Sequence, residues 1–253
     1  AYLRAGNGHV RRNGPAVAVV PDSLEIPGDA PSGTALVPEA ETTCRREGGR
    51  MALFLGRLHP LKGVDLLLEA WQRTGRARPA DAAFWRLLIV GPDEQGTRAT
   101  LLRQAGRLGL ACRCIAGGRA GEAGDGIFRE PLSRRGAPAE IIFAGPVDGD
   151  AKWELYRQAD LVVLPSRSEN FGIVVAEAAG MGKPVVATQA TPWSGLAERR
   201  AGWWTPVSVE GLTGALDEAL AMPAASLAEM GARGREWVAT EFGRSRIARQ
   251  WVE

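Results

Sequence analysis

The sequence predicts a doubly wound α/β fold, in which helices cover both faces of a Rossmann-like parallel sheet. Short apolar, β-branched runs alternate along the chain with segments of helical period, which is the pattern of this fold class. The apolar runs are nearly continuous rather than alternating, as is typical of parallel strands buried on both faces. Hydrophobic residues make up 45% of the chain and charged residues 24%, an ordinary globular composition that can build such a core.

The predicted strands and helices follow one another in order. The apolar runs predict strands at residues 15–21, 51–58, 84–91, 140–145, 160–165 and 184–188, with a further short one at 201–206. Apolar residues at three- and four-residue intervals predict helices at residues 64–73, 97–109, 150–159, 173–182, 209–222, 224–242 and 245–253.

Residues 111–139 interrupt this alternation. The segment is rich in Gly and Arg and has no usable period, so we expect a long surface loop inserted between a helix and the next strand. A phosphate-binding loop is rejected, because no Gly-Lys-Ser/Thr follows the glycines. With this insertion, residues 1–253 are expected to form one domain.

Charge and cysteine content exclude several classes of function. A formal net charge of +2 gives no reason to expect a nucleic-acid partner. The sequence contains no apolar run near the roughly 20 residues of a membrane helix, and its first residues lack the apolar region of a signal peptide. Cys44, Cys112 and Cys114 suit a reducing cytosol. Because His9 and His59 lie far from them, we expect free thiols rather than a metal site.

The loop at residues 56–65 carries Arg57 at a strand end and Lys62 just before a helix. In open α/β sheets, ligands bind beyond the carboxyl ends of the strands. A cation at the positive end of a helix dipole is unfavourable by itself, but not when an anion is shared with the free amides of Gly63 and Val64. We therefore predict an anion site, although either basic residue alone would be interpreted as an exposed loop residue.

Glu169 and Glu177 lie eight residues apart in a stretch that is otherwise mostly apolar or glycine. On one helix they would be about 12 Å apart along the axis, too far for a glycosidase pair of roughly 5 to 9.5 Å. The stretch is not one helix, because Pro165 and Ser166 end a strand and Gly172 allows an abrupt turn. Glu169 is thus expected in the loop and Glu177 just over one turn into the next helix.

Two carboxylates on either side of a helix start suit a ligand with both hydroxyl groups and phosphate. The first amides of this helix, at residues 171–174, are expected to point into the crevice. The alternative makes Glu177 a favourable helix-dipole charge and Glu169 a solvated loop residue. That alternative explains either glutamate better than it explains both.

Asp148-Gly149-Asp150 matches an Asp-x-Asp pattern that binds metal in one class of enzymes. Three residues are a weak signal, and Asp150 stands where a helix N-cap is expected. The cap is the preferred interpretation, and no metal is predicted.

Longer segments match a known order of motifs. They read FLGRLHPLKGVDLLLEAW, LLIVGPDEQG, IIFAGPVDGDAKWELYRQADLVVLPSRSENFGIVVAEAAGMGKPVVAT and TPWSGLAERRAGWW. Together they resemble the donor-binding C-terminal half of retaining GT-B glycosyltransferases of the group-one family (family 4), from about residue 51 onward. Glu169 to Glu177 is similar to the Glu-x7-Glu signature of that family.

The resemblance implies a role for each matched residue. Arg57 and Lys62 correspond to the basic pair that holds the donor diphosphate and stabilises it as it leaves. Glu177 corresponds to the glutamate that accepts from the ribose hydroxyls, and Glu169, the third implied catalytic residue, to the one beside the donor sugar. The resemblance implies that Gly145, Pro146 and Val147 lie near the base of the nucleotide. The other implied donor-binding residues are Gly56, Arg57, Lys62, Glu169, Asn170, Phe171, Gly172, Ile173 and Glu177.

The resemblance also implies a hexosyltransferase-type reaction with retention and without metal or cofactor, from a UDP-, GDP- or ADP-linked sugar. SENFGIVV and TPWSG are similar to segments of transferases that build bacterial surface polysaccharide or lipopolysaccharide precursors. GT-B enzymes have two Rossmann-like domains, and this chain has room for the second only. An N-terminal acceptor-binding domain is therefore expected in cis or in trans, with residues 1–26 as the junction and the chain inactive alone.

Two other functions stay open at this point. One is a non-catalytic donor-binding subunit that docks onto a separate acceptor-binding chain. The other is a nucleotide-sugar epimerase or hydrolase of similar fold, with Glu169 as acid or base. The expected location is the cytoplasm, with at most peripheral contact with the cytoplasmic face of a membrane.

Overall fold

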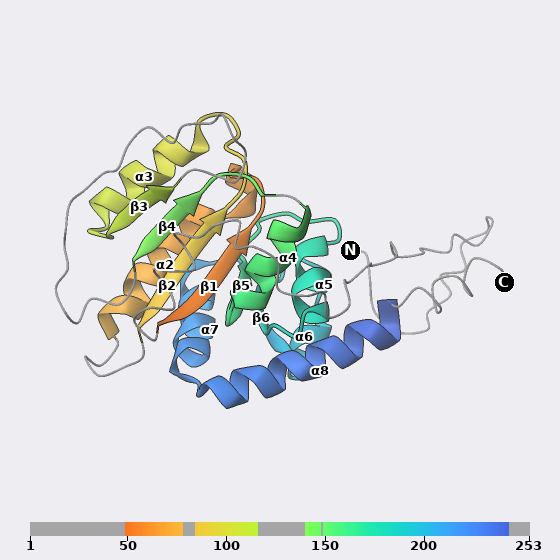
Figure 1. Ribbon diagram of the computed structural model, residues 1–253. Helices are drawn as coiled ribbons and strands as arrows, with labels where there is room; N and C mark the ends of the chain where they lie inside the picture. The colour runs from red at the N-terminus through yellow and green to blue at the C-terminus, as the bar shows by residue number, and fades with distance from the viewer. Residues whose placement is uncertain (1–48, 78–83, 116–139, 148, 243–253) are drawn as a thin grey trace, which may run out of the picture.

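The computed structural model describes residues 49–77, 84–115, 140–147 and 149–242. Seven parallel strands form one sheet in the order β3-β4-β2-β1-β5-β6-β7, with helices on both faces (Figure 1). This architecture confirms the predicted doubly wound α/β fold. In the described part of the chain, no helix is long and apolar enough to cross a membrane.

The elements have the following bounds. The strands are β1 (Arg50–Leu55), β2 (Trp85–Val90), β3 (Cys112–Ile115), β4 (Ile141–Ala144), β5 (Leu161–Leu164), β6 (Val185–Thr188) and β7 (Gly202–Thr205). The helices are η1 (Pro60–Lys62), α2 (Val64–Ala77), α3 (Thr97–Arg107), α4 (Gly149–Gln158), α5 (Ile173–Gly180), α6 (Gly195–Glu198), α7 (Val209–Ala221) and α8 (Ala224–Phe242).

The prediction of a loop over residues 111–139 is wrong at its start. Cys112–Ile115 forms β3, which pairs in parallel with β4 at the edge of the sheet. Three of its four residues are only half-buried, so an edge strand of this kind lacks the continuous apolar run that marks the central strands. Residues 116–139 lie outside the described residues, as do the predicted junction 1–26, the strand 15–21 and the helix 245–253.

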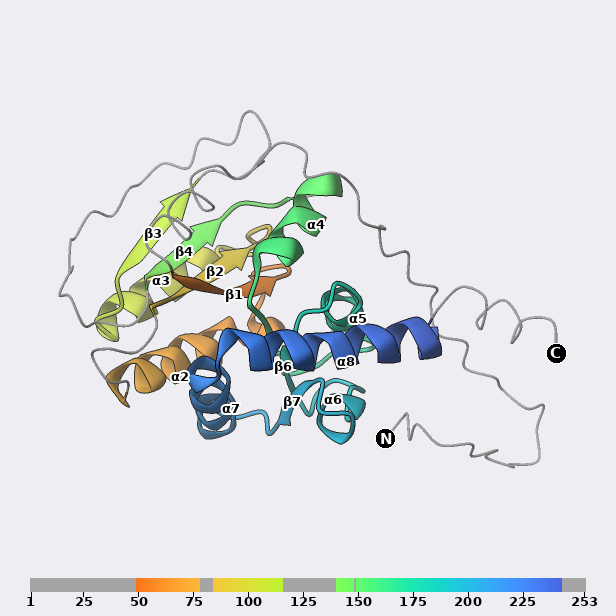
Figure 2. The same cartoon turned by 60° about the horizontal axis from the view of Figure 1, so that its bottom comes forward.

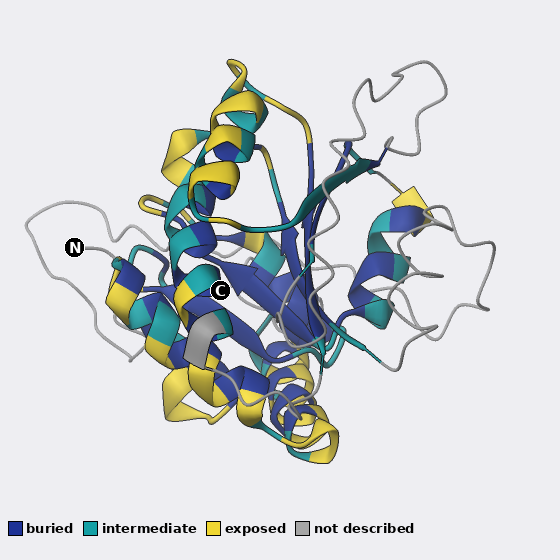
Figure 3. Cartoon of the chain, turned by 90° about the vertical axis from the view of Figure 1, so that its left-hand side faces the viewer, coloured by how far each residue is buried: buried dark blue, intermediate teal, exposed yellow. Residues whose placement is uncertain are grey.

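Alternate side chains of the strands enter two separate cores. On one face, Leu53, Leu88 and Val162 pack with residues of α4, α5 and α8. On the other face, Phe54 and Val163 pack with residues of α2, α3 and α7. Figure 3 shows the central strands buried and the helices exposed on their outer sides, and Figure 2 shows α8 running past α7 toward α5. Burial on both faces is the physical reason for the continuous apolar runs.

The strand order reverses at β1. From β1 the chain moves to β2, then to the edge strand β3 and to β4 between β3 and β2, and returns through α4 to β5 on the other side of β1. A ligand crevice forms at such a switch point, beyond the carboxyl ends of the strands. The loops that follow β1 and β5, residues 56–63 and 165–172, therefore flank the expected crevice.

Cys112 and Cys114 are free thiols, as predicted. Burial raises the pKa of the Cys112 thiol from 9.0 to about 12, with a smaller contribution from Cys114. The folded state therefore keeps this thiol neutral at pH values where the unfolded state ionises it. The resulting stability is fully present below pH 9.0 and is lost as the pH rises toward about 12.

We expect the urea midpoint of unfolding to fall as the pH rises from 9.0 toward about 12. Cys112→Ala should flatten that slope, because the variant has no thiol to ionise in the unfolded state. Urea titrations at several pH values measure the effect. A slope that is the same in the parent chain and in Cys112→Ala would contradict the assignment.

Candidate functional site

The loops after β1 and β5 meet through Lys62 and Glu169. Lys62 Nζ donates a hydrogen bond to Glu169 Oε2 at 2.5 Å, and the two side chains are only 19% and 16% exposed. An ion pair this shielded from water is screened less than a surface pair. Its loss would leave one charge uncompensated at the switch point. Two of the predicted site residues are thus brought into direct contact.

Gly63 allows the two loops to approach. It follows η1 in the left-handed conformation, with φ 67°. A Cβ at this position would lie 2.0 Å from the carbonyl oxygen of Pro165, the residue after β5, so only glycine fits. At the start of η1, His59 Nδ1 accepts from the Leu61 amide at 3.2 Å. The histidine therefore caps this short helix, and the β1–α2 loop packs directly on the end of β5.

Glu177 lies in α5 and is 7% exposed. Two donors from α4 hold its carboxylate: Lys152 Nζ at 2.7 Å from Oε1 and the Tyr156 hydroxyl at 2.9 Å from Oε2. Burial raises the pKa of Tyr156 well above 10, and the nearby carboxylate adds to the shift, so the phenol stays a donor. Neither donor was predicted from the sequence. Their four-residue spacing, which places them on one face of a helix, was the available signal.

Gly172 turns the chain between the two glutamates. It precedes α5 with φ 76° and ψ 58°, which confirms the predicted turn. The Val175 amide donates to the Gly172 carbonyl at 2.8 Å, but α5 has no side-chain cap, so the amides before Val175 can bind an anion. Trp193 Nε1 donates to the Phe171 carbonyl at 2.5 Å, and the two rings pack 5.2 Å apart. Trp193, which the sequence analysis did not single out, thus holds the turn in place.

Arg57 lies at the other side of the β1 loop. Its side chain is 62% exposed, and NH1 donates to both carboxylate oxygens of Glu94 at 3.0 and 3.2 Å. Glu94 lies in the loop after β2, so the partner of Arg57 is on the β2 side of β1. The partner of Lys62, Glu169, is on the β5 side. An ion pair this exposed contributes little stability, so an incoming anion can take Arg57 from Glu94 with a small loss. The two predicted cations therefore share a loop but have different partners.

The remaining predicted residues also lie at the carboxyl edge of the sheet. Gly145, Pro146 and Val147 follow β4, and Gly56 follows β1, while Asn170 and Ile173 are exposed next to Gly172. Asp150 lies in the first turn of α4 instead of at its cap, so that prediction is wrong. Asp148 lies outside the described residues. Within the described ranges, no three His, Cys, Asp or Glu side chains are grouped so as to hold a metal ion.

Comparison with known proteins gives one family and several relatives. The family described as Glycosyl transferases group 1 matches residues 41–237. A D-inositol 3-phosphate glycosyltransferase of Gordonia bronchialis is 36% identical over 190 residues, which cover 72% of this chain and 35% of that protein. A second one, of Acidothermus cellulolyticus, is 34% identical over 141 residues, 56% of this chain and 26% of the relative. The chain thus matches about a quarter to a third of these curated relatives.

Solved structures show the same fold. The C-terminal domain of LpcC, a glycosyl transferase group 1 family protein of Francisella tularensis, has a TM-score of 0.58 at 20% identity. The match covers 81% of this chain and 93% of that domain. Anabaena Alr3699/HepE, in complex with UDP and glucose, has a TM-score of 0.60 at 22% identity, over 85% of this chain and 51% of that one. The sheet and helices are therefore those of a GT-B C-terminal domain.

Proposed function

The chain belongs to the glycosyl transferase group 1 family, and we propose that it is the domain that binds the nucleotide-sugar donor in a retaining glycosyltransferase. One observation carries the proposal. The shielded Lys62–Glu169 pair, the start of α5 without a side-chain cap and the buried Glu177 carboxylate come from the segments that follow β1 and β5 at the switch point of the sheet. A cation, free amides and a carboxylate suit a ligand that carries both phosphate and hydroxyl groups.

The cation and the amides would act on the diphosphate. As the bond between the sugar and the diphosphate breaks, negative charge grows on the departing phosphate oxygen. Lys62 and the first amides of α5 are held in place before the reaction, so they can stabilise this charge without reorganising. Arg57, released from Glu94, would bind the diphosphate from the β2 side. In this proposal the protein's own groups stabilise the leaving group, and no metal is needed.

The two carboxylates would have different roles. Glu177 would accept from the ribose hydroxyls, because its two α4 donors occupy only part of the roughly four lone-pair sites of a carboxylate. Glu169 would lie beside the transferred sugar, next to the lysine that binds the diphosphate. Gly172 separates these roles by turning the chain between the two side chains.

The names of the relatives and solved neighbours support a proposal for the donor and acceptor classes. Solved neighbours are described with UDP and glucose or with UDP-2-fluoro glucose, so a UDP-linked sugar is the first donor to test, before GDP- and ADP-linked ones. The curated relatives are named inositol phosphate glycosyltransferases, and one neighbour, WaaG, acts in lipopolysaccharide biosynthesis. We propose a bacterial surface-polysaccharide or lipopolysaccharide precursor as acceptor, with an inositol phosphate as the alternative.

The partial match also favours a second arrangement. Because the chain matches only part of each relative, the acceptor-binding half would be supplied either in cis or by a separate chain. In both arrangements the donor half binds its nucleotide by itself, so one experiment tests both.

Calorimetry with UDP, GDP and ADP tests the donor site. We expect the purified chain to bind at least one of the three with a Kd between about 1 μM and about 1 mM. The corresponding nucleoside should bind at least about tenfold more weakly, since it lacks the diphosphate that Lys62 and α5 would hold. Circular dichroism controls for folding. If a folded chain binds none of the three at millimolar concentration, the proposal is wrong.

A further inference from the structure

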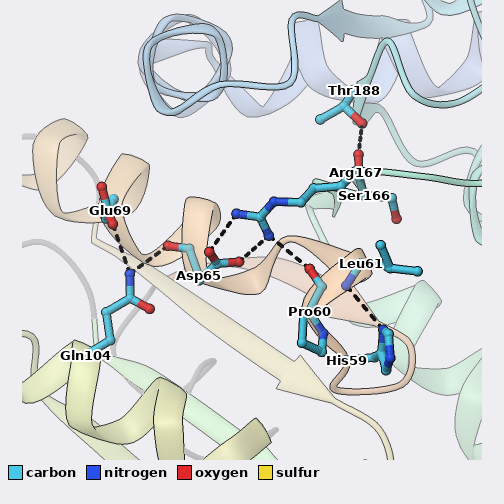
Figure 4. Close-up of polar contacts among 9 residues, drawn as sticks. All are labelled: His59, Pro60, Leu61, Asp65, Glu69, Gln104, Ser166, Arg167 and Thr188. Carbon is cyan, nitrogen blue, oxygen red and sulfur yellow. Dashed lines mark hydrogen bonds and ion pairs between the residues drawn. The ribbon is translucent and has the colours of Figure 1, made fainter.

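We propose that Arg167 is a positioning residue that clamps the loop of Lys62 to the loop of Glu169. Its guanidinium donates to Asp65 in a fork, with NH1–Oδ1 and NH2–Oδ2 both at 2.6 Å (Figure 4). Arg167 follows β5, and Asp65 lies in the first turn of α2, which follows the β1 loop. The fork therefore spans the switch point. Only the identity of the ligand rests on the proposed function.

Arg167 holds the β1 loop on both sides of Lys62. Its NH1 also donates to the Pro60 carbonyl at 2.9 Å, and its backbone amide donates to the Leu61 carbonyl at 2.7 Å. Pro60 and Leu61 come just before the lysine, and Asp65 comes three residues after it. One residue, through its side chain and its backbone amide, thus fixes the short segment from which Lys62 extends.

The same arginine sits beside the residues that fix Glu169. Its neighbour Ser166 donates from Oγ to Glu169 Oε2 at 3.4 Å, the same oxygen that accepts from Lys62. Thr188 on β6 donates to the Ser166 carbonyl at 2.5 Å. The start of the β5 loop is therefore tied to β6 on one side and, through Arg167, to η1 and α2 on the other.

The partner of Arg167 is itself supported. Gln104 Nε2 on α3 donates to the Asp65 carbonyl at 3.1 Å and to Glu69 Oε1 at 3.0 Å (Figure 4). The first turn of α2 is thus fixed from α3, so the fork pulls the β5 loop against a rigid element. Lysine cannot replace the arginine, because a single ammonium cannot form two parallel bonds to a carboxylate.

The exposure of the Arg167–Asp65 pair indicates that the pair positions the two loops more than it stabilises the fold. The side chains of Arg167 and Asp65 are 34% and 39% exposed, and pairs this open to water contribute little to the free energy of unfolding. What the pair supplies is the relative placement of the two loops. Its loss should therefore change the site more than the stability of the chain.

Two variants of the full chain test the clamp, Arg167→Gln and Asp65→Asn. We expect each to reduce the preference for the bound nucleoside diphosphate over its nucleoside by about tenfold, with nucleoside affinity changed by less than about twofold. The double variant should lose no more than either single one, because the two residues act through one pair. Arg73→Gln is the matched control, since it removes an exposed arginine pair with Glu210 away from the crevice.

Hydrogen exchange tests the clamp without a ligand. In Arg167→Gln the amides of Lys62 and Gly63, which bond within η1, should exchange about tenfold faster, while exchange within α5 stays unchanged. Unchanged exchange at these two amides would overturn the clamp, and so would an equal loss of diphosphate and nucleoside affinity. Failure of the parent chain to bind any nucleoside diphosphate would overturn the proposed function instead, and the exchange result would still decide whether the clamp exists.

Discussion

Replacing Lys62 by methionine is expected to weaken binding of a nucleoside diphosphate about 100-fold. Two effects act in the same direction. The variant loses the cation that would contact the diphosphate, and it leaves the Glu169 carboxylate without its partner at 2.5 Å. Because that carboxylate is largely shielded from water, its uncompensated charge repels the incoming anion. Methionine keeps most of the apolar stem, so packing of the loop should change little.

Nucleoside and diphosphate titrations separate these effects from general damage. Lys62→Met should leave the affinity for the nucleoside within about twofold of that of the parent chain, because a nucleoside has no diphosphate for Lys62 to contact. Adding Glu169→Gln to Lys62→Met should recover about tenfold of the lost diphosphate affinity, since the unpaired carboxylate is then gone. If the double variant binds as weakly as Lys62→Met, the repulsion argument is wrong.

The same loop shows what periodicity can and cannot predict. The central strands, such as the one predicted at 84–91, could be predicted from the sequence. A continuous apolar run is stable only where it is buried between two layers of helices. Lys62 and Glu169 were placed in loops at the correct edge of the sheet. Their direct contact was not predicted, because it depends on Gly63 packing against Pro165, more than a hundred residues away in sequence.

Contacts between the loops after β1 and β5 cannot be predicted from local sequence patterns for the same reason. Arg167 and Asp65 are 102 residues apart, and neither stands out within its own segment. β3 was not predicted, because an edge strand needs no continuous apolar run. Lys152 and Tyr156, by contrast, lie four residues apart on one helix, so a local pattern could have placed them on one face but not against Glu177. Roles within the site came from the family resemblance, not from spacing.

Glu177→Ala is expected to weaken nucleoside diphosphate binding about tenfold more than Glu169→Ala does, because in the proposed site only Glu177 accepts from the ribose. The variant also has a structural effect, since it leaves the Tyr156 hydroxyl buried without its acceptor. That loss should lower the free energy of unfolding by about 1–3 kcal/mol. Tyr156→Phe is the matched control, because it removes a bond to the same carboxylate but leaves the carboxylate available to the ribose.

Binding of the 2′-deoxy analogue of the nucleoside diphosphate tests directly whether Glu177 accepts from the ribose. The parent chain should bind the analogue more weakly than the ribose form, whereas Glu177→Ala should bind the two equally, since the acceptor of the hydroxyl is gone. Glu169→Ala and Tyr156→Phe should keep the discrimination. Ribose recognition also has to act on the nucleoside, so Glu177→Ala should weaken nucleoside and diphosphate by the same factor, unlike Lys62→Met. Equal losses from the two glutamate variants would show that Glu177 does not serve the ribose.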